Sequence, residues 1–258
     1  MDRSYCGVEQ MLNGGDSSKL QKGVLRVIGN EHAFAAIKDD GSVVSWGLAA
    51  FGGDSSSVAD KLQSGVAQVI GIERAFAATK EDGSVVSWGR ADDGGDSSSV
   101  ADKLQEGVLQ VVGNRSAFAA IKDDGSVVSW GLANFGGDSS SVADKLQEGV
   151  VQVIGNQKAF AAIKEDGSVV SWGRADDGGD SSSVADKLQE GVLQVVGNPY
   201  AFAAIKEDGS VVSWGNAIHG GDSSSAVDKL QSGVVQASYW KSGSFCGNQR
   251  RWICRIVG

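Results

Sequence analysis

Proline, cysteine and histidine are scarce in this sequence, and their scarcity excludes several kinds of site. The 258 residues include 1 Pro, 3 Cys and 2 His. Zinc sites need several cysteine and histidine ligands, whereas His32 and His219 stand at non-equivalent places in the sequence. A Gly-rich phosphate loop and a nucleophile elbow are also missing. We therefore expect no enzymatic activity, no metal and no cofactor.

Long apolar runs and an excess of positive charge are absent as well. No run of about 18 apolar residues occurs, so the sequence predicts no membrane-spanning helix. The formal net charge of −9 argues against direct binding to nucleic acid or to anionic membranes. The first residues lack the apolar core of a secretory signal. We expect a cytoplasmic protein with no small-molecule substrate.

What the sequence does contain is a repeat. Residues 33–47 read AFAAIKDDGSVVSWG, and this stretch returns every 42 residues, at 75–89, 117–131, 159–173 and 201–215. A period of this length indicates a propeller, a solenoid or an array. Asp40-Gly41 lies between two runs of β-forming residues, which predicts a β-hairpin with a two-residue turn.

Two further segments complete each repeat. A Val-rich run bounded by glycines, such as 23–29, precedes the hairpin and predicts a third strand. The motif GGDSS leads into SVADKLQSG at 57–65, where Val58 and Leu62 are spaced as on one face of a short helix. Asp54 or a following serine is expected to cap that helix. Small or apolar residues on both faces of the strands predict sheets that are covered on both sides.

The segment VVQVIGNQKAFAAIKEDGSVVSWG at 150–173 resembles the repeat of the RCC1 family of β-propellers. Both have a Val-rich strand, a small-residue strand, an acidic-Gly turn and a strand ending in Trp-Gly. The resemblance covers residues 24–215 and a weak sixth copy. This chain departs from the family pattern at two places. One is Lys158-Ala159 at the start of the second strand, and the other is the GGDSS motif that follows Trp-Gly. Its shorter unit is closer to the compact three-stranded blades of bacterial β-lactamase-inhibitor propellers. The family includes exchange factors, ligase modules and inhibitors, so the resemblance implies fold more than function.

We therefore expect one all-β domain over residues 1–258, a β-propeller of about six blades. Each blade is expected to have three antiparallel strands, with a short helix between blades. The perfect repeats span about 14–232. Residues 233–258 together with 1–13 are expected to form a degenerate closing blade, in which Phe245 takes the place of Phe202. Cys6 is expected near Cys246 or Cys254, within reach of a closure disulfide; the alternative is reduced thiols, as in most intracellular proteins.

Three repeated or motif-like features have a plain structural interpretation. The repeated tryptophans predict packing between blades, with each indole N–H bonded to the backbone, rather than a ring that stacks ligands. The aspartate of GGDSS predicts a helix cap rather than a calcium ligand. Asn114-Arg115-Ser116 matches a glycosylation sequon, which we interpret as a coincidence.

Two windows vary while the rest of the repeat is copied. The first window precedes the second strand: Glu31-His32, Glu73-Arg74, Arg115-Ser116, Gln157-Lys158 and Pro199-Tyr200. The second window follows the third strand, at 48–51, 90–93, 132–135, 174–177 and 216–219. In an antiparallel blade both windows lie at one end, and the acid pairs of the hairpin turns lie at the other. Varying loops on a rigid scaffold are typical of binding surfaces, whereas drift after duplication is the alternative.

The sequence favours a non-enzymatic protein-interaction scaffold that binds an unidentified protein partner through the variable windows. The alternatives are a guanine-nucleotide exchange factor for a small GTPase, for which no residues carry over, and a structural or assembly subunit of a larger complex. The candidate partner-binding residues are Phe51, Arg74, Arg90, Arg115, Phe135, Lys158, Arg174, Tyr200 and His219.

Overall fold

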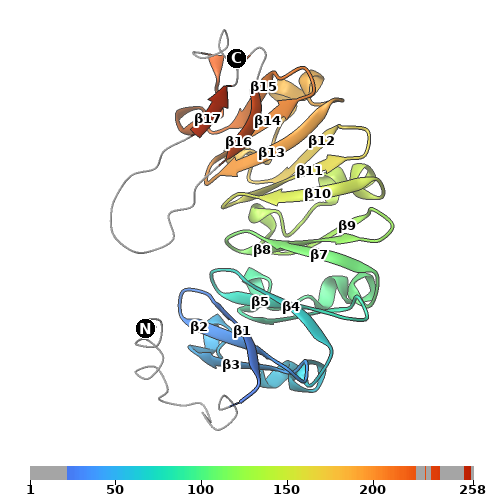
Figure 1. Ribbon diagram of the computed structural model, residues 1–258, viewed down its shortest axis with the longest axis vertical. Helices are drawn as coiled ribbons and strands as arrows, with labels where there is room; N and C mark the ends of the chain where they lie inside the picture. The colour runs from blue at the N-terminus through green and yellow to red at the C-terminus, as the bar shows by residue number, and fades with distance from the viewer. Residues whose placement is uncertain (1–21, 225–229, 231–233, 239–252, 257–258) are drawn as a thin grey trace. The chain divides into compact units, whose positions relative to one another are not determined.

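The computed structural model describes residues 22–224, 230, 234–238 and 253–256, and in them each complete repeat forms a three-stranded antiparallel sheet (Figure 1). The first strand of a repeat pairs with the second, and the second pairs with the third, as the sequence predicts. The strands of repeats 1 to 5 are β1 (Val24–Gly29), β2 (Ala33–Lys38), β3 (Val43–Gly47), β4 (Val66–Gly71), β5 (Ala75–Lys80), β6 (Val85–Gly89), β7 (Val108–Gly113), β8 (Ala117–Lys122), β9 (Val127–Gly131), β10 (Val150–Gly155), β11 (Ala159–Lys164), β12 (Val169–Gly173), β13 (Val192–Asn198), β14 (Ala201–Lys206) and β15 (Val211–Gly215).

The chain divides into two compact units, which we describe separately. Unit 1 comprises residues 1–123 and 128–133, and it contains repeats 1 to 3 apart from the turn at 124–127. Unit 2 comprises residues 124–127 and 134–258, and it contains repeats 4 and 5. Within unit 1, β4 packs against β1 and β2, and β7 packs against β4 and β5. Closure of one domain over the whole chain stays a prediction.

The hairpin between the second and third strands has a three-residue loop rather than the two-residue turn that we predicted. In repeat 1, Gly41 N–H donates to the Lys38 carbonyl at 3.0 Å, and Lys38 N–H donates to the Ser42 carbonyl at 2.9 Å. This is a tight turn followed by a left-handed residue, which is the usual three-residue hairpin loop. Gly41 has φ +73°, and a Cβ there would lie 2.7 Å from Gly65 N of the next repeat. Glycine is thus required both by the turn and by the close approach of the next repeat.

The predicted short helix between sheets is present as a 3-10 helix. In the first connection, η3 spans Ser56–Leu62, and Val58 N–H donates to Ser55 O at 3.0 Å. The Asp54 carboxylate accepts the Ser56 N–H at 2.9 Å, as the capping prediction implies, while Ser55 makes no side-chain cap. The corresponding helices of the later connections are η5 (Ser98–Leu104), η7 (Ser140–Leu146) and η9 (Ser182–Lys187).

A second 3-10 turn follows the third strand and was not predicted. It comprises η2 (Ala49–Phe51), η4 (Ala91–Asp93), η6 (Ala133–Phe135), η8 (Ala175–Asp177) and η10 (Ala217–His219). These turns contain most of the second window. Each described cap of this turn is a glycine in the left-handed region, such as Gly52 with φ +88°.

The core lies between consecutive sheets of a unit. In repeat 2 the Trp88 side chain is 1% exposed and stacks on Phe76, with the ring centroids 5.4 Å apart. The indole N–H of Trp88 donates to Gly52 O at 3.0 Å. The same bond recurs at Trp130, Trp172 and Trp214. The packing interpretation of these tryptophans is therefore confirmed.

The first strands of repeats 2 to 5 are only half covered and β1 is largely exposed, which corrects the expectation of two covered faces. The pairing of β1 with β2 shifts between Val24 and Arg26, so Leu25 is the extra residue of a β-bulge. Bulges of this kind turn a side chain outward and disrupt a sheet edge. Leu25 is 72% exposed, and its counterparts Leu109, Val151 and Leu193 are at least half exposed.

Part of the sixth repeat belongs to the described chain. β16 (Val234–Ser238) pairs with β17 (Ile253–Ile256), and Ala237 faces Cys254 in the same register that places Val195 opposite Ala204. β17 therefore takes the place of a second strand. We predicted that Phe245 takes the place of Phe202, and that alignment puts the second strand earlier in the chain than β17. The register of β16 with β17 shows that this prediction is wrong. Cys6 and Cys246 lie outside the described residues, so the closure disulfide with Cys254 stays a prediction. Among the residues described, no helix has the length and apolarity needed to span a bilayer.

Candidate functional site

The two variable windows of each repeat are bonded to each other through the backbone. Leu48 N–H donates to His32 O at 2.9 Å in repeat 1, and Arg90 N–H donates to Arg74 O at 2.9 Å in repeat 2. Repeats 3 to 5 have the same bond from Leu132, Arg174 and Asn216. In repeat 1 the sheet register pairs Ala33 with Gly47 at this end and Ile37 with Val43 at the other, next to the hairpin turn. Within each repeat, both windows lie at one end of the sheet and the acid pair lies at the other.

An asparagine at the end of the first strand fastens the two windows together. In repeat 4, Asn156 Oδ1 accepts the N–H groups of Lys158 and Ala159, both at 2.8 Å, and Asn156 Nδ2 donates to Asp177 O at 2.6 Å. Asn30 and Asn198 make the corresponding bonds to both windows of their repeats. We did not single out this residue from the sequence. Its recurrence at the same place in four of the five repeats, with Ile72 in repeat 2, was the available signal.

The asparagine also explains the apparent glycosylation sequon. Asn114 is 8% exposed, and its Oδ1 accepts the N–H groups of Ser116 and Ala117 at 3.0 and 2.9 Å. A buried amide that holds a turn is not a surface acceptor. The coincidence that we inferred from the sequence agrees with this geometry.

In repeat 1 the windows meet through aromatic side chains. The rings of His32 and Phe51 lie edge to face with their centroids 4.5 Å apart. The guanidinium of Arg74, from the first window of repeat 2, lies over the Phe51 ring at 5.6 Å. A cation in this position is attracted by the electron-rich face of the ring. The windows of neighbouring repeats in unit 1 are therefore in contact.

In repeats 2 and 4 the windows meet through a buried carboxylate. Asp93 is 5% exposed, and its Oδ2 lies 3.6 Å from Arg74 and 3.5 Å from Arg90. In unit 2, Asp177 is equally buried and lies 3.1 Å from Lys158 Nζ and 3.3 Å from Arg174 Nε. Each aspartate is thus compensated by two cations, one from each window, as burial of a charge requires.

One further ion pair links repeats 2 and 3 within unit 1. The Arg115 guanidinium contacts both carboxylate oxygens of Glu73, and the second contact, from Nη2 to Oε1, measures 3.1 Å. The hydrogen bond from Arg115 lowers the pKa of Glu73 below its ordinary value, and the same bond raises the pKa of Arg115. Both groups stay charged at neutral pH.

In repeat 5 an aromatic pair again joins the windows. Tyr200 and His219 have ring centroids 4.3 Å apart, and His219 Nδ1 lies 2.8 Å from Asn216 Oδ1. The Lys158 ammonium group of the preceding repeat lies 5.4 Å from the centre of the Tyr200 ring. The pattern of repeat 1, with a ring contacting a ring and a cation beside them, recurs in unit 2.

The candidate residues differ in how far they are open to solvent. The side chains of Arg90, Arg115 and Arg174 are 49%, 48% and 50% exposed, and His219 is exposed. Phe51, Arg74, Phe135, Lys158 and Tyr200 are half-buried. Asp93 and Asp177, which lie in the same windows, are buried. The reason is that the windows pack on each other.

The aspartate of GGDSS caps the turn that follows it, as Asp54 does by accepting the Ser56 N–H. No group of three or more His, Cys, Asp or Glu side chains among the described residues is placed to hold a metal ion. The pKa of the Asp54 carboxyl is lowered, chiefly by the backbone N–H of Ser56, as expected for a capping residue.

Comparison with solved structures finds similar chains at low sequence identity. Human WBSCR16 matches with 21% identity and a TM-score of 0.46, over 74% of this chain and 61% of that chain. Prp20p from Saccharomyces cerevisiae, also described as yeast RCC1, matches with 15% identity and a TM-score of 0.46, over 78% of this chain and 58% of that chain. The ectodomain of the Arabidopsis thaliana receptor kinase ACR4 matches with 17% identity and a TM-score of 0.43, over 74% and 65%.

RCC1 proteins are thus among the structures to which this chain is similar, and the chain spans about three-fifths of the length of the first two. No protein-family model matches the sequence, and the search among curated proteins found no match.

Proposed function

We propose that this protein is an interaction scaffold that binds a protein partner through its variable windows. One observation supports the proposal: the windows differ in sequence between repeats, and their side chains are nevertheless held in place. The windows are the parts of the repeat that change, yet their side chains are held by hydrogen bonds, ion pairs and ring contacts. A side chain that is already held loses little conformational entropy on binding, which favours affinity.

Arg90 and Arg174 fit this role best. Each lies with Nε within 3.5 Å of a buried aspartate, and each remains about half exposed. The ionic contact at Nε holds the guanidinium beside the aspartate, and its remaining N–H groups can bind a carboxylate or a carbonyl of a partner. Arg115, which Glu73 holds through two hydrogen bonds, adds a second oriented arginine to unit 1.

Exposed leucines accompany the arginines in unit 1. Leu48 and Leu132 stand at the same place in repeats 1 and 3 as Arg90 does in repeat 2, and they are 53% and 36% exposed. Arginine is enriched among residues that dominate binding energy at protein interfaces, and neighbouring side chains that contribute little energy help to exclude water around them. The two histidines contribute packing here, since His32 contacts Phe51 and His219 contacts Tyr200.

The proposal is tested by affinity capture from the native cell, followed by mass spectrometry. The bait variants are Arg90→Ala with Arg174→Ala, and Phe51→Ser with Phe135→Ser. A matched control is Lys103→Ala with Lys187→Ala, which removes the same charge from exposed helices outside the windows. We expect the arginine pair to lower partner recovery at least about tenfold, as is typical of a residue that dominates an interface, and the lysine pair to leave recovery unchanged.

The identity of the captured protein distinguishes the alternatives. A single GTPase whose recovery depends on the windows favours nucleotide exchange, and a fixed stoichiometric set favours an assembly subunit. Recovery that is the same for all variants contradicts binding through the windows.

A further inference from the structure

The first residue after the third strand is exposed in all three repeats of unit 1, and its chemistry alternates. It is Leu48 in repeat 1, Arg90 in repeat 2 and Leu132 in repeat 3. The leucines are 53% and 36% exposed, and the Arg90 side chain is 49% exposed. We call these three residues the mixed stripe, because they place one cation between two apolar side chains.

The backbone of the mixed stripe is held by hydrogen bonds. In each repeat the N–H of the stripe residue donates to a carbonyl of the first window at 2.9 Å. Leu48 has φ −74° and ψ 120°, and Arg90 has φ −69° and ψ 121°. The repeats themselves pack on each other, β4 on β1 and β7 on β4. The backbone of the stripe is therefore preformed, and little ordering of it is needed when a ligand binds.

Cations face solvent at the middle of the mixed stripe. The carboxylates that balance them, Asp93 and Glu73, have side chains that are only 7% and 10% exposed. Arg90 contacts the first of these and Arg115 contacts the second, and both arginine side chains remain about half exposed. Each guanidinium thus keeps N–H groups that the buried carboxylates do not use. A carboxylate of a partner can accept two of them at once.

The spacing of the stripe fits an extended segment. Sheets that pack face to face lie about 10 Å apart, so residues at the same place in neighbouring repeats are separated by about that distance. A polyproline II helix has three residues per turn, and residues i, i+3 and i+6 lie on one face of it about 9 Å apart. An α-helix needs residues i, i+7 and i+14 to make similar steps of about 10.5 Å. Seven residues in the polyproline II conformation therefore suffice to reach all three stripe residues.

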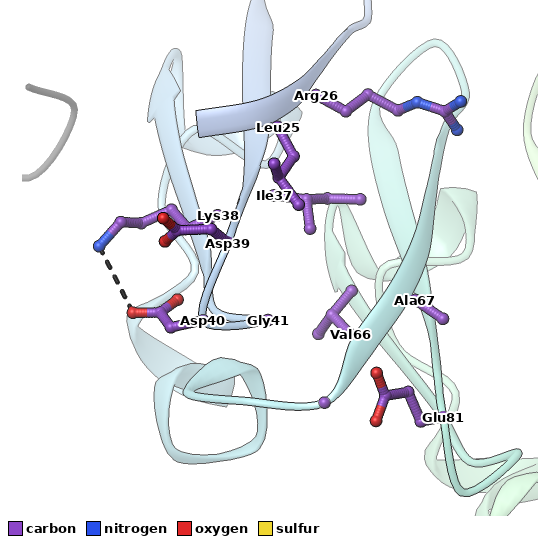
Figure 2. Close-up of a pocket in the computed structure, with 11 residues that line it drawn as sticks. Leu25, Arg26, Ile37, Lys38, Asp39, Asp40, Gly41, Val66, Ala67 and Glu81 are labelled. Carbon is purple, nitrogen blue, oxygen red and sulfur yellow. Dashed lines mark ion pairs between the residues drawn. The ribbon is translucent and has the colours of Figure 1, made fainter. Parts of the chain in front are cut away.

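The hairpin-turn end of the same sheets presents acids instead. Each turn carries two adjacent acids and one lysine, as in Lys38-Asp39-Asp40 of repeat 1. Figure 2 shows Lys38 paired with Asp40 at that turn, and Glu81 stands at the turn of repeat 2. Asp39, Asp40 and Glu81 are exposed. Like charge repels an acidic segment at this end, which favours its binding at the windows.

We propose that the mixed stripe binds a segment of the protein partner in the polyproline II conformation. In this segment an aspartate or glutamate stands three residues after one apolar side chain and three residues before another. The carboxylate accepts N–H groups of Arg90, and the two apolar side chains lie on Leu48 and Leu132, where they lose contact with water. This inference rests on the proposed function, because it names the chemistry of a partner that the windows bind.

The test is a titration of the full chain with the peptide acetyl-Leu-Pro-Pro-Glu-Pro-Pro-Leu-amide, followed by amide chemical shifts. The prolines favour the polyproline II conformation. One control peptide has glutamine in place of the glutamate, and another, Leu-Pro-Glu-Pro-Pro-Pro-Leu, moves the glutamate by one residue. We expect saturable shifts at residues 48–49, 90–92 and 132–133. Both control peptides are expected to bind about tenfold more weakly, the usual effect of losing a charged hydrogen bond.

The chain supplies a matched variant for the cation. Arg90→Leu introduces the residue that repeats 1 and 3 have at the same place, so it fits the fold. We expect this variant to bind the glutamate and glutamine peptides equally, because the group that distinguishes them is gone. Lys103→Leu makes the same change of charge on η5, outside the windows. It is expected to keep the preference of about tenfold for the glutamate peptide.

Two further variants test the apolar and the acidic neighbours of Arg90. Leu48→Asn introduces the residue that repeat 5 has at this place, Asn216. We expect it to weaken both peptides several-fold through the loss of apolar contact. Asp92 and Glu31 are exposed acids of the same windows. Asp92→Asn is expected to strengthen the glutamate peptide about twofold, because it removes a like charge near Arg90.

Three outcomes overturn the inference. One is an equal affinity of the wild-type chain for the glutamate and glutamine peptides. Another is an equal affinity for the peptide with the displaced glutamate, which indicates attraction to charge without spacing. The third is a set of shifts centred on the hairpin turns. In each case a native partner whose capture depends on the windows leaves the proposed function standing, so the two failures are distinguishable.

Discussion

At the scale of single residues, the variable windows change in matched pairs. Asp93 faces Arg74 and Asp177 faces Lys158, so a base stands opposite each buried acid. In repeats 1 and 5 a ring of the second window meets a ring of the first, as Phe51 meets His32, whereas in repeat 3 Phe135 stands in a repeat whose first window is Arg115-Ser116. In repeats 1, 2, 4 and 5 the side chains of the two windows therefore pack on each other.

The asparagine that joins the windows gives a prediction at this scale. Asn156→Ala removes three hydrogen bonds and leaves the Asp177 carbonyl and two N–H groups without their partner in a buried place. We expect the free energy of unfolding to fall by about 2–3 kcal/mol, the usual cost of leaving buried polar groups unsatisfied. Urea denaturation measures this change.

Asn30→Ala is the matched control for this effect. Asn30 makes the same bonds in repeat 1 but is less buried, so water can replace the lost amide. We expect a smaller loss of about 1 kcal/mol there. Equal losses at the two sites, or no loss at Asn156, contradict the role assigned to this residue.

At the scale of elements, the hairpin turn is held by an aspartate that bonds to the serine two residues later. In repeat 2, Asp82 Oδ1 accepts the N–H of Ser84 at 2.9 Å and its hydroxyl at 2.6 Å. These bonds, the hydroxyl bond first, lower the pKa of the Asp82 carboxyl. Corresponding turns at Asp40, Asp166 and Asp208 have lowered pKa values from the same cause.

The lowered pKa values predict how stability responds to acid. A carboxyl whose pKa is lower in the folded state stabilises the fold above its unfolded pKa of about 3.9, and this contribution is lost as the pH falls through the folded pKa. We expect stability to decline below about pH 4. Ser84→Ala should raise the pKa of Asp82 towards its ordinary value, as measured by carboxyl carbon NMR.

Asp96 is the internal control for that measurement. Its pKa is lowered chiefly by the backbone N–H of Ser98, which the Ser84→Ala substitution leaves in place. An unchanged titration of Asp82 in the variant contradicts the assignment of its shift to Ser84.

At the scale of the whole molecule, the sequence predicted the features that depend on the repeat. The period and the Asp-Gly signal predicted three antiparallel strands, and the repeated tryptophan predicted a buried indole with a backbone partner. The strand order placed both windows at one end of the sheet. Each of these follows from local pattern and from residues that return at fixed spacing.

The features that we could not predict depend on contacts between segments. The hydrogen bond from Asn156 to Asp177 O joins residues 21 apart, and the burial of Asp93 requires cations from two loops. The contact at Asp93 needs three side chains to meet. Neither the period of the repeat nor residue propensity predicts such a meeting. The bulge of the first strand was missed because its extra residue breaks the alternation of a regular strand.

An exchange of windows within unit 1 tests most directly whether the windows bind the partner while the strands and turns only support them. Residues 31–32 are exchanged with 73–74, and residues 48–51 with 90–93, so that composition and net charge do not change. Both windows of a repeat move together, and their matched pairs are kept. We expect the free energy of unfolding to stay within about 2 kcal/mol of the wild-type value, since the pairs within each repeat are kept and the contact of Arg74 with the Phe51 ring of the neighbouring repeat is lost.

The measurement is the recovery of the protein partner by the exchanged chain relative to the wild-type chain. We predict that the exchanged chain folds and loses the partner, because the order of apolar and charged groups along the unit is altered. A folded, equally stable chain that recovers the same partner in the same amount contradicts the claim that the variable windows form the binding surface.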